Sequence, residues 1–175
     1  TLFTAHDVKN HLSSDNGIDQ AVSWCKRTAV SKVYVEVFRD GYQAERHALQ
    51  HAKDRFLAEH IEVSGCVTTT QVGKKSTRGE IIACFSGLPT QARLQSIFEY
   101  AASPLDEIMI DDFWFTDCAC EQCDAARKAR KVIVGDKTYS VPGDSWEDYR
   151  RELMVRLSRD RVLRRAKRVN PKARL

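Results

Sequence analysis

"KVYVEVFRDGYQAERHALQHAKDRFLAEHIEVSGCV", residues 32–67, is the stretch that decides the fold. Its first part, 32–38, alternates β-branched and aromatic residues, a composition that favours a strand. Its middle part, 44–60, repeats apolar residues at helical spacing, and 61–67 returns to a strand-like pattern. The stretch therefore predicts a strand–helix–strand unit in which the two strands run parallel.

The same alternation extends in both directions from this unit. A strand is predicted at 1–5, helices at 17–30 and 90–102, and a fourth strand at 106–113. Ser145, with Asp148 three residues later, matches a capping box that opens a long fourth helix, and Asn170-Pro171 ends it. Residues 172–175 resemble the start of a fifth strand.

Two α/β architectures fit this order: an open doubly wound sheet, or the first half of a TIM-type (β/α)8 barrel. The turn after the first strand has no Gly-x-Gly-x-x-Gly sequence and no phosphate-binding loop, which weakens the nucleotide-binding open sheet. The long loops follow strands, where a barrel carries its catalytic insertions. A complete barrel needs roughly 250 residues, so residues 1–175 predict a single, partial barrel domain.

Composition supports a globular core and argues against a membrane or a nucleic acid as partner. Apolar residues make up 42% of the 175, and no apolar run approaches the roughly 18 residues of a membrane span. The chain shows no signal-peptide pattern at its start. Residues 144–175 hold eleven Lys and Arg against five Asp and Glu. This basic stretch could form a nucleic-acid face, but its helical interleaving with apolar residues favours the solvated face of an amphipathic helix.

Two adjacent carboxylates, Asp111 and Asp112, end the fourth predicted strand. In either architecture this is the end where catalytic groups gather. Phe113 and Trp114 follow directly, and aromatic rings beside carboxylates suit a sugar, which offers apolar C–H faces and many hydroxyls. We expect one aspartate to be the catalytic group and the other its hydrogen-bonding partner, because adjacent residues on a strand point to opposite faces. Capping of a turn or helix is the alternative role.

Other strand ends supply candidate substrate contacts. His6 ends the first predicted strand, and Glu36 and Arg39 lie near the end of the second. Glu36 stands between Val35 and Val37, a context that places its carboxylate on the interior face of a barrel. Arg39 is its candidate partner in an ion pair.

The chain has six cysteines, three of them in the run Cys118-x-Cys120-x-x-Cys123. Thiolates this dense favour zinc, which in structural sites takes four ligands in a closed tetrahedron. Cys84, in the loop after the third strand, is the expected fourth ligand, whereas Cys25 and Cys66 lie in predicted core positions. Disulfides, free thiols and an iron–sulfur cluster are the alternatives, although the spacing matches none of the usual cluster runs.

Together these residues resemble the catalytic barrel of the family 42 glycoside hydrolases, the β-galactosidases, and related predicted glycosidases. The resemblance is strongest over residues 80–130 and rests on the carboxylate pair followed by Cys118, Cys120 and Cys123. It implies a structural zinc held by these three cysteines and Cys84, and a general acid/base at the position of Asp112. Where the family has Asn-Glu, this chain has Asp111-Asp112.

The sequence thus predicts a glycoside hydrolase that acts on an oligosaccharide or polysaccharide through carboxylate acid/base chemistry. The alternative is a non-catalytic, zinc-stabilised barrel that binds carbohydrate or another protein. A carbohydrate substrate is the expected partner, with no nucleic acid and no membrane, and the sequence carries no signal of oligomeric state. Zinc-binding thiols must stay reduced, which favours the cytoplasm, although an exported protein that takes up zinc promptly also fits.

Overall fold

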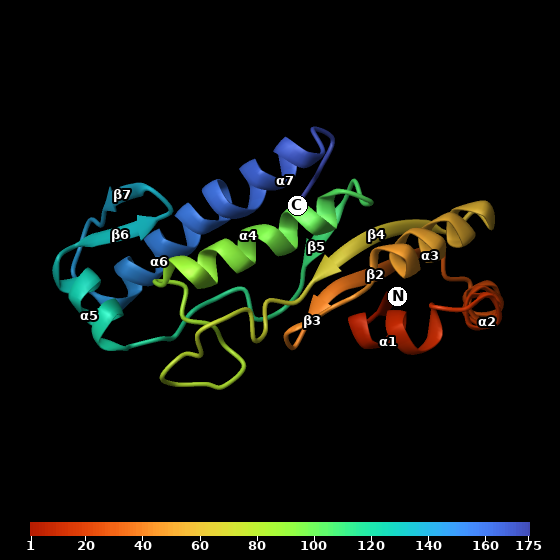
Figure 1. The fold of residues 1–175 in the computed structure, drawn as a ribbon, viewed down its shortest axis with the longest axis horizontal. Coiled ribbons are helices and arrows are strands. Elements are labelled where there is room, and N and C mark those ends of the chain that lie inside the picture. Colours follow the sequence, from red (N-terminus) through yellow and green to blue (C-terminus); the bar gives the residue numbers. More distant parts are fainter.

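The computed structural model describes residues 1–175 as one elongated α/β molecule (Figure 1). Its elements, in chain order, are β1 (Leu2–Phe3), α1 (Ala5–His11), α2 (Asp15–Arg27), β2 (Lys32–Arg39), β3 (Tyr42–Gln43), α3 (Arg46–Ala58), β4 (Glu62–Val67), α4 (Leu88–Ala102), β5 (Ile108–Ile110), α5 (Glu121–Lys128), β6 (Lys131–Val134), β7 (Lys137–Ser140), α6 (Trp146–Leu157), the π-helical segment η1 (Ser158–Leu163) and α7 (Arg164–Val169).

The main sheet has the order β1-β2-β4-β5, and these four strands are parallel. Each strand therefore lies beside the next one along the chain, apart from β3, which turns back antiparallel onto the end of β2. Beyond β5, Glu107 and Arg174 form a parallel bridge. The predicted parallel α/β class is confirmed, and the bridge lies where residues 172–175 were predicted to begin a fifth strand.

The two faces of this sheet differ in chemistry. Val33, Val35 and Val37 alternate along β2 and are fully buried in the core, to which α3 and α4 contribute their apolar residues. The other face carries polar side chains that meet across strands, such as Ser64 Oγ, which donates to Glu107 Oε1 at 2.8 Å. Burial of the first face stabilises the sheet, whereas the second holds the residues of the candidate site.

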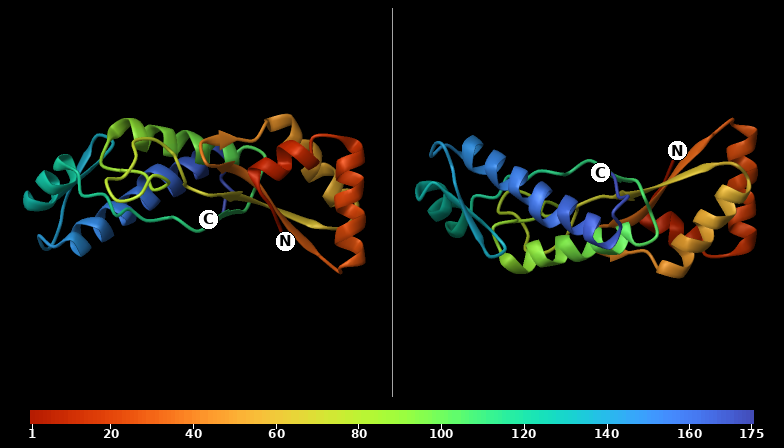
Figure 2. Two further views of the ribbon diagram at one scale, coloured as in Figure 1. Left: turned by 90° about the horizontal axis from the view of Figure 1, so that it is seen from below. Right: turned by 90° about the horizontal axis from the view of Figure 1, so that it is seen from above.

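Helix α4 lies alongside the continuous run α6–η1–α7, as all views of the ribbon show (Figures 1 and 2). Both bury apolar residues at helical spacing, including Leu94 and Phe98 on α4 and Leu153 and Leu157 on α6. Ser145 caps α6, as predicted, by accepting a hydrogen bond from the backbone N–H of Asp148. The run ends at Val169, immediately before Asn170-Pro171.

The N-terminal region corrects part of the sequence prediction. The first strand covers only Leu2–Phe3, and the segment predicted as a loop forms α1. Thr4 and Asp7 form a full capping box at the start of α1, and Val8 packs into the core. His6 therefore lies in the first turn of a helix and does not end a strand.

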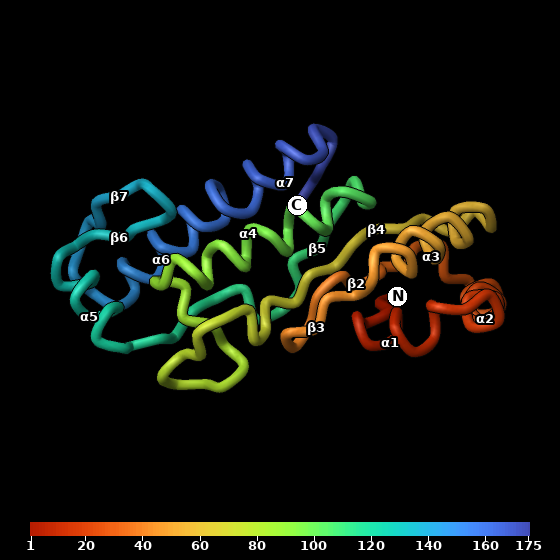
Figure 3. The backbone as a smooth tube through the Cα atoms, viewed as in Figure 1, coloured from red at the N-terminus to blue at the C-terminus, as the bar shows by residue number.

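Two further segments differ from the prediction or extend it. Residues 121–140 form α5 and the β6–β7 hairpin, which lie at the end of the molecule away from α2 (Figure 1). Residues 68–87 form a long excursion between β4 and α4, visible as the yellow-green loop in Figure 3. No helix has both the length and the apolar character that crossing a membrane would require.

Candidate functional site

Four side chains meet at the carboxyl-terminal edge of the parallel strands, and we call them the edge cluster: Glu36, Arg39, Thr68 and Asp111. Arg39 lies at its centre. Its Nε donates to Glu36 Oε2 at 2.8 Å, and its Nη2 donates to Asp111 Oδ2 at 3.0 Å. The guanidinium thus joins a carboxylate of β2 to one directly after β5, and Arg39 and Asp111 lie 72 positions apart in the sequence.

A local irregularity in β2 makes this arrangement possible. In a regular strand Glu36 and Arg39, three residues apart, would point to opposite faces. The pairing of β2 with β4 shifts register between Glu36 and Phe38, which has the form of a β-bulge. A bulge redirects the side chains that follow it, so Arg39 returns to the face of Glu36 and reaches across to Asp111.

Glu36 is fully buried and fully used as a hydrogen-bond acceptor. Besides Arg39, it accepts hydrogen bonds from the backbone N–H of Ala5 at 2.7 Å and from the hydroxyl of Thr68. The hydrogen bond to Glu36, with the nearby charge of Asp111, raises the pKa of Arg39 above its usual value. Burial beside these carboxylates raises the pKa of the Cys66 thiol to about 12. The cluster therefore combines two carboxylates and a guanidinium, and the neutral thiol of Cys66 lies beside it.

Asp111 and Asp112 diverge at the end of β5. Asp111 turns into the edge cluster, where Thr68 Oγ1 also lies 3.2 Å from its Oδ2. Asp112 is exposed, and the one hydrogen bond of its side chain is accepted from the backbone N–H of Phe113, at 3.1 Å. Phe113 has a φ of +73°, an uncommon conformation for a bulky residue. One aspartate is thus held by the protein and the other is presented to solvent, as strand alternation predicts.

The aromatic candidates take different positions around this edge. Trp114 packs edge-on against Phe85, with ring centroids 5.6 Å apart, and its indole N–H donates to Ser158 Oγ on η1. His6 is exposed on α1 and stacks on Tyr42 at 5.3 Å. Neither side chain joins the edge cluster, although both lie in segments that flank the same end of the strands.

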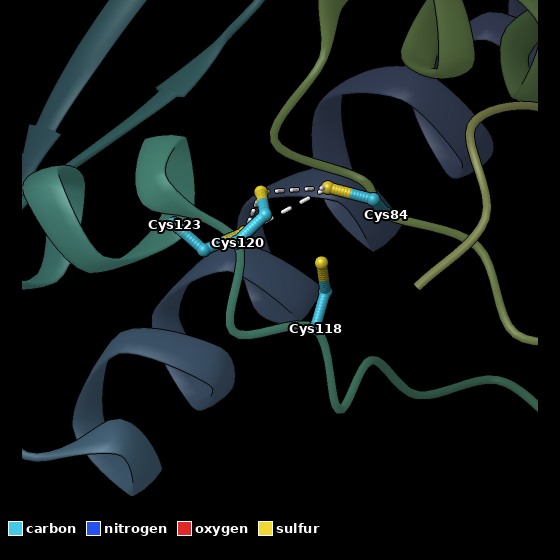
Figure 4. A group of neighbouring side chains, drawn as sticks. All are labelled: Cys84, Cys118, Cys120 and Cys123. Atoms are coloured by element: carbon cyan, nitrogen blue, oxygen red, sulfur yellow. Dashed lines mark hydrogen bonds between the residues drawn. The ribbon is translucent and has the colours of Figure 1, made fainter. Parts of the chain in front are cut away.

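The four predicted cysteine ligands form one cluster, the cysteine cluster: Cys84, Cys118, Cys120 and Cys123. Figure 4 shows their sulfur atoms turned toward a common point, with Cys84 from the loop before α4, Cys118 and Cys120 from the segment before α5, and Cys123 from α5 itself. Cys84 Sγ lies 3.8 Å from Cys120 Sγ and 3.7 Å from Cys123 Sγ, and the last two are 3.6 Å apart. All four sulfurs lie within 4.8 Å of one another, so the group could hold a metal ion.

The surroundings of the cysteine cluster act differently on its thiols: they favour the thiolate at Cys84, and the hydrogen bond with Cys84 and burial raise the pKa of Cys123. The hydrogen bond from Cys123 lowers the pKa of Cys84, and Ser86 Oγ lies 3.1 Å from the Cys84 sulfur. Lys74 Nζ lies 3.7 Å from Cys120 Sγ, and the neighbouring thiolates raise the pKa of this lysine. All six cysteines of the chain are free, so the disulfide alternative is not realised here.

Two residues that contact the clusters were not predicted from the sequence. Thr68 opens the run "TTT" directly after β4, and its position beside a strand that carries Glu36 was the available signal. Lys74 lies in the long loop after β4, and no local pattern marks it. Its contact with Cys120 spans 46 residues and follows only from the path of that loop.

Comparison with known proteins identifies the family to which this chain belongs. An uncharacterized protein of Saccharolobus solfataricus, SSO3021, is 25% identical to it, in an alignment that covers 93% of this chain and 29% of the relative. This chain thus spans less than a third of that relative's length. No solved structure matches. A family model described as "Probable glycosyl hydrolase, catalytic domain" matches residues 1–175. Its description does not name family 42, so membership of family 42 stays a prediction, but the chain belongs to the family of probable glycosyl hydrolase catalytic domains.

Proposed function

We propose that this domain hydrolyses a glycosidic bond of an oligosaccharide or polysaccharide by carboxylate acid/base chemistry at the carboxyl-terminal edge of its sheet. The observation that carries the proposal is the divergent pair at the end of β5: Asp111 is held by Arg39, and Asp112 is open to solvent. A substrate at this edge would meet one free carboxyl group and one fixed polar group. The family match supplies the reaction class.

We further propose that the sheet is part of a (β/α)8 barrel. Doubly wound sheets reverse their strand order at a switch point, whereas β1, β2, β4 and β5 follow one another in sequence, with Arg174 next in line. The polar face that carries Glu36 and Asp111 would be the barrel interior, and the apolar face packs on helices, as barrels require. An apolar groove of about 480 Å³ beside β5, lined partly by Ile110, Met154 and Leu175, supports continuation of the layers there.

The two aspartates would have separate roles. Asp112 would be the general acid/base, because only its side chain is free to meet a glycosidic oxygen. Asp111, fixed by Arg39 and Thr68, would accept a hydrogen bond from a sugar hydroxyl and orient the ring. Glycosidases need two carboxyl groups that flank the scissile bond. Asp111 and Asp112 share one strand end and point apart, so the second carboxyl group of the reaction would come from another strand end.

We assign the cysteine cluster to a structural zinc ion. In a tetrahedral site with Zn–S bonds of about 2.3 Å, neighbouring sulfurs lie about 3.8 Å apart. The three sulfur–sulfur distances of 3.6–3.8 Å among Cys84, Cys120 and Cys123 match this spacing. With Cys118 as the fourth ligand the coordination shell would be closed, so the ion would hold the two loops together and leave the chemistry to the carboxylates. A reducing compartment such as the cytoplasm suits these thiols.

The test compares three aspartate-to-asparagine variants of the full-length protein on a panel of aryl glycosides. Asp112→Asn keeps the side-chain volume but removes the titrating group, so turnover should fall by ~100-fold or more. Asp111→Asn should cost about tenfold, because Arg39 can still hold the amide oxygen. Asp144→Asn is the matched control, an exposed aspartate on the loop before α6, and should leave turnover unchanged.

Near-normal turnover in Asp112→Asn, with the fold intact by circular dichroism, would place the acid/base elsewhere. If the wild-type protein hydrolyses none of the glycosides but binds oligosaccharides in equilibrium titrations, the non-catalytic barrel is the better description. In that case, replacing Asp111 or Arg39 should still weaken oligosaccharide binding, because the fixed polar atoms of both residues face the same edge.

A further inference from the structure

A basic pocket is lined by residues of the β6–β7 hairpin and of the helical run η1–α7. Its volume is about 180 Å³. Seven of its eight lining residues are charged, and the full set is Val134, Asp136, Lys137, Asp160, Arg161, Arg164, Arg165 and Arg168. None belongs to the edge cluster or to the cysteine cluster.

The positive charge of this pocket is only partly neutralised by the protein. Asp160 accepts hydrogen bonds from Arg159 at 3.0 Å and from Arg164 at 2.8 Å, so its own charge is already compensated. The remaining four cations, Lys137, Arg161, Arg165 and Arg168, make no ion pair, although all line the pocket. The second carboxylate of the lining, Asp136, is in no ion pair either, so four unpaired cations stand against one unpaired carboxylate. Buried or clustered cations without partners attract anions strongly because their fields add.

The walls of the pocket are held in place by contacts that do not involve the four cations without an ion pair. Tyr139 of β7 donates its hydroxyl proton to Asp160, and the guanidinium groups of Arg156 and Arg159 lie over its ring. These contacts tie the hairpin to the helix at the π-helical turn, a feature that often marks functional sites.

Arg161 is also fixed in direction. It donates to Gln95 on α4 and lies so close to Gly135 that a Cβ there would collide with its Nη2. Gly135, at a φ of +66°, opens the hairpin turn and leaves the space that the guanidinium fills. Any larger residue at this position would displace Arg161 from the pocket wall.

Size and chemistry together indicate the ligand. A pocket of about 180 Å³ is smaller than the roughly 300–1,000 Å³ of sites that enclose a whole drug-sized molecule. It exceeds by several times the ~30 Å³ share of a water molecule in the liquid. Guanidinium groups match the oxygens of phosphate and sulfate in bidentate geometry. We propose that this pocket is a binding site for a phosphate or sulfate group, free in solution or esterified to a sugar.

The experiment measures anion binding to the full-length protein by isothermal titration at constant ionic strength. The probes are inorganic phosphate, inorganic sulfate, glucose 6-phosphate and glucose 6-sulfate, with chloride as the reference. Arg165→Ala/Arg168→Ala removes two unpaired cations from the pocket. Lys167→Ala/Lys172→Ala is the control, because it removes the same charge from exposed positions nearby that do not line the pocket.

Saturable binding of an oxyanion should weaken by about tenfold or more in the pocket variant and by less than about twofold in the control. Tighter binding of the ester than of the inorganic ion assigns the site to an esterified ligand, and the reverse order assigns it to the free ion. The proposal is overturned if oxyanions bind no better than chloride, or if the two variants lose affinity equally. Circular dichroism of both variants checks that the fold is intact.

Discussion

The cysteine cluster and the edge cluster both bring potential metal ligands together, yet they differ in what balances their charge. Cys84, Cys118, Cys120 and Cys123 form one group with ligand atoms within 4.8 Å of one another, and Glu36, Cys66 and Asp111 form another. The second group already contains a cation, since Arg39 donates to both carboxylates. Its thiol, Cys66, has a pKa raised to about 12 and stays protonated.

Close ligand atoms are therefore not sufficient to indicate a metal site. The cysteine cluster has Lys74 at its rim but no cation among the four sulfurs. Repulsion among several thiolates in one place would destabilise the fold unless an ion joined them. In the edge cluster the guanidinium of Arg39 balances the charge of the two carboxylates, and their oxygen atoms remain at the site as hydrogen-bond acceptors. We therefore expect one metal ion per chain, in the cysteine cluster only.

Replacing Cys118 by serine should have the largest effect on stability. Loss of one ligand opens the tetrahedron, and the free energy of unfolding should fall by several kcal/mol. This lies below the roughly 10–16 kcal/mol that zinc contributes to zinc-finger peptides, because the present fold has its own apolar core. Elemental analysis and thermal unfolding of protein purified without added metal measure both effects.

Cys25→Ala is the matched control for this variant, because Cys25 is a buried cysteine on α2 outside the cluster. It should cost only about 1 kcal/mol, a typical value for a point substitution, and leave the metal content unchanged. A metal-to-protein ratio that stays the same in Cys118→Ser would contradict the assignment of this residue as a ligand. Disulfides among the four cysteines in mass mapping would contradict the zinc site altogether.

Glu36→Gln should have the next largest effect and leave the metal content unaltered. The substitution removes one partner of a buried ion pair, for which losses of about 3–5 kcal/mol are typical. We expect the lower end of that range, because Asp111 remains as a partner of Arg39. Thermal unfolding with Glu62→Gln, an exposed glutamate on β4, as control measures the difference. Loss of metal in Glu36→Gln would show that the two clusters are not independent.

The cysteine cluster was more predictable from sequence than the edge cluster, for a physical reason. Three of its ligands lie within six residues, and their spacing on its own brings three thiols into reach of one ion. Glu36 and Asp111 were both singled out as strand-end residues, but their joint contact with Arg39 depends on strand register and on the bulge between Glu36 and Phe38. Neither can be read from a single sequence.

Helix α1 and the hairpin β6–β7 were not predicted, although the sequence carries a local signal for each. Thr4 and Asp7 have the spacing of a capping box, yet the absence of a long apolar period hid the short helix α1. The alternation around Gly135-Asp136 fits a two-residue hairpin turn, and the hairpin β6–β7 follows it. The parallel core was predicted correctly because β2, β4 and the helices α3 and α4 have strong apolar patterns, although β1 and β5 are shorter than predicted.

The smallest expected effect concerns a second ion pair on the polar face of the sheet, near the opposite ends of the strands. Lys32 Nζ pairs with Glu107 Oε1, and Ser64 also donates to that carboxylate. The hydrogen bonds from Lys32 and Ser64 lower the pKa of Glu107. Both charged side chains are about one-third exposed, so solvent screens them and the pair should contribute less than about 1 kcal/mol.

The sign of its pH dependence follows from the lowered pKa of Glu107. A carboxyl group with a lower pKa in the folded state stabilises the fold above its unfolded-state pKa of about 4.3. That contribution disappears as the pH falls through the lower, folded-state pKa. Between pH 6 and pH 3 the wild-type protein should therefore lose slightly more stability than Glu107→Gln, in urea unfolding at low salt. Equal pH dependence in the two proteins would mean that solvent screens this pair completely. The stabilising ion pairs on this face of the sheet would then be those that Arg39 makes with Glu36 and Asp111.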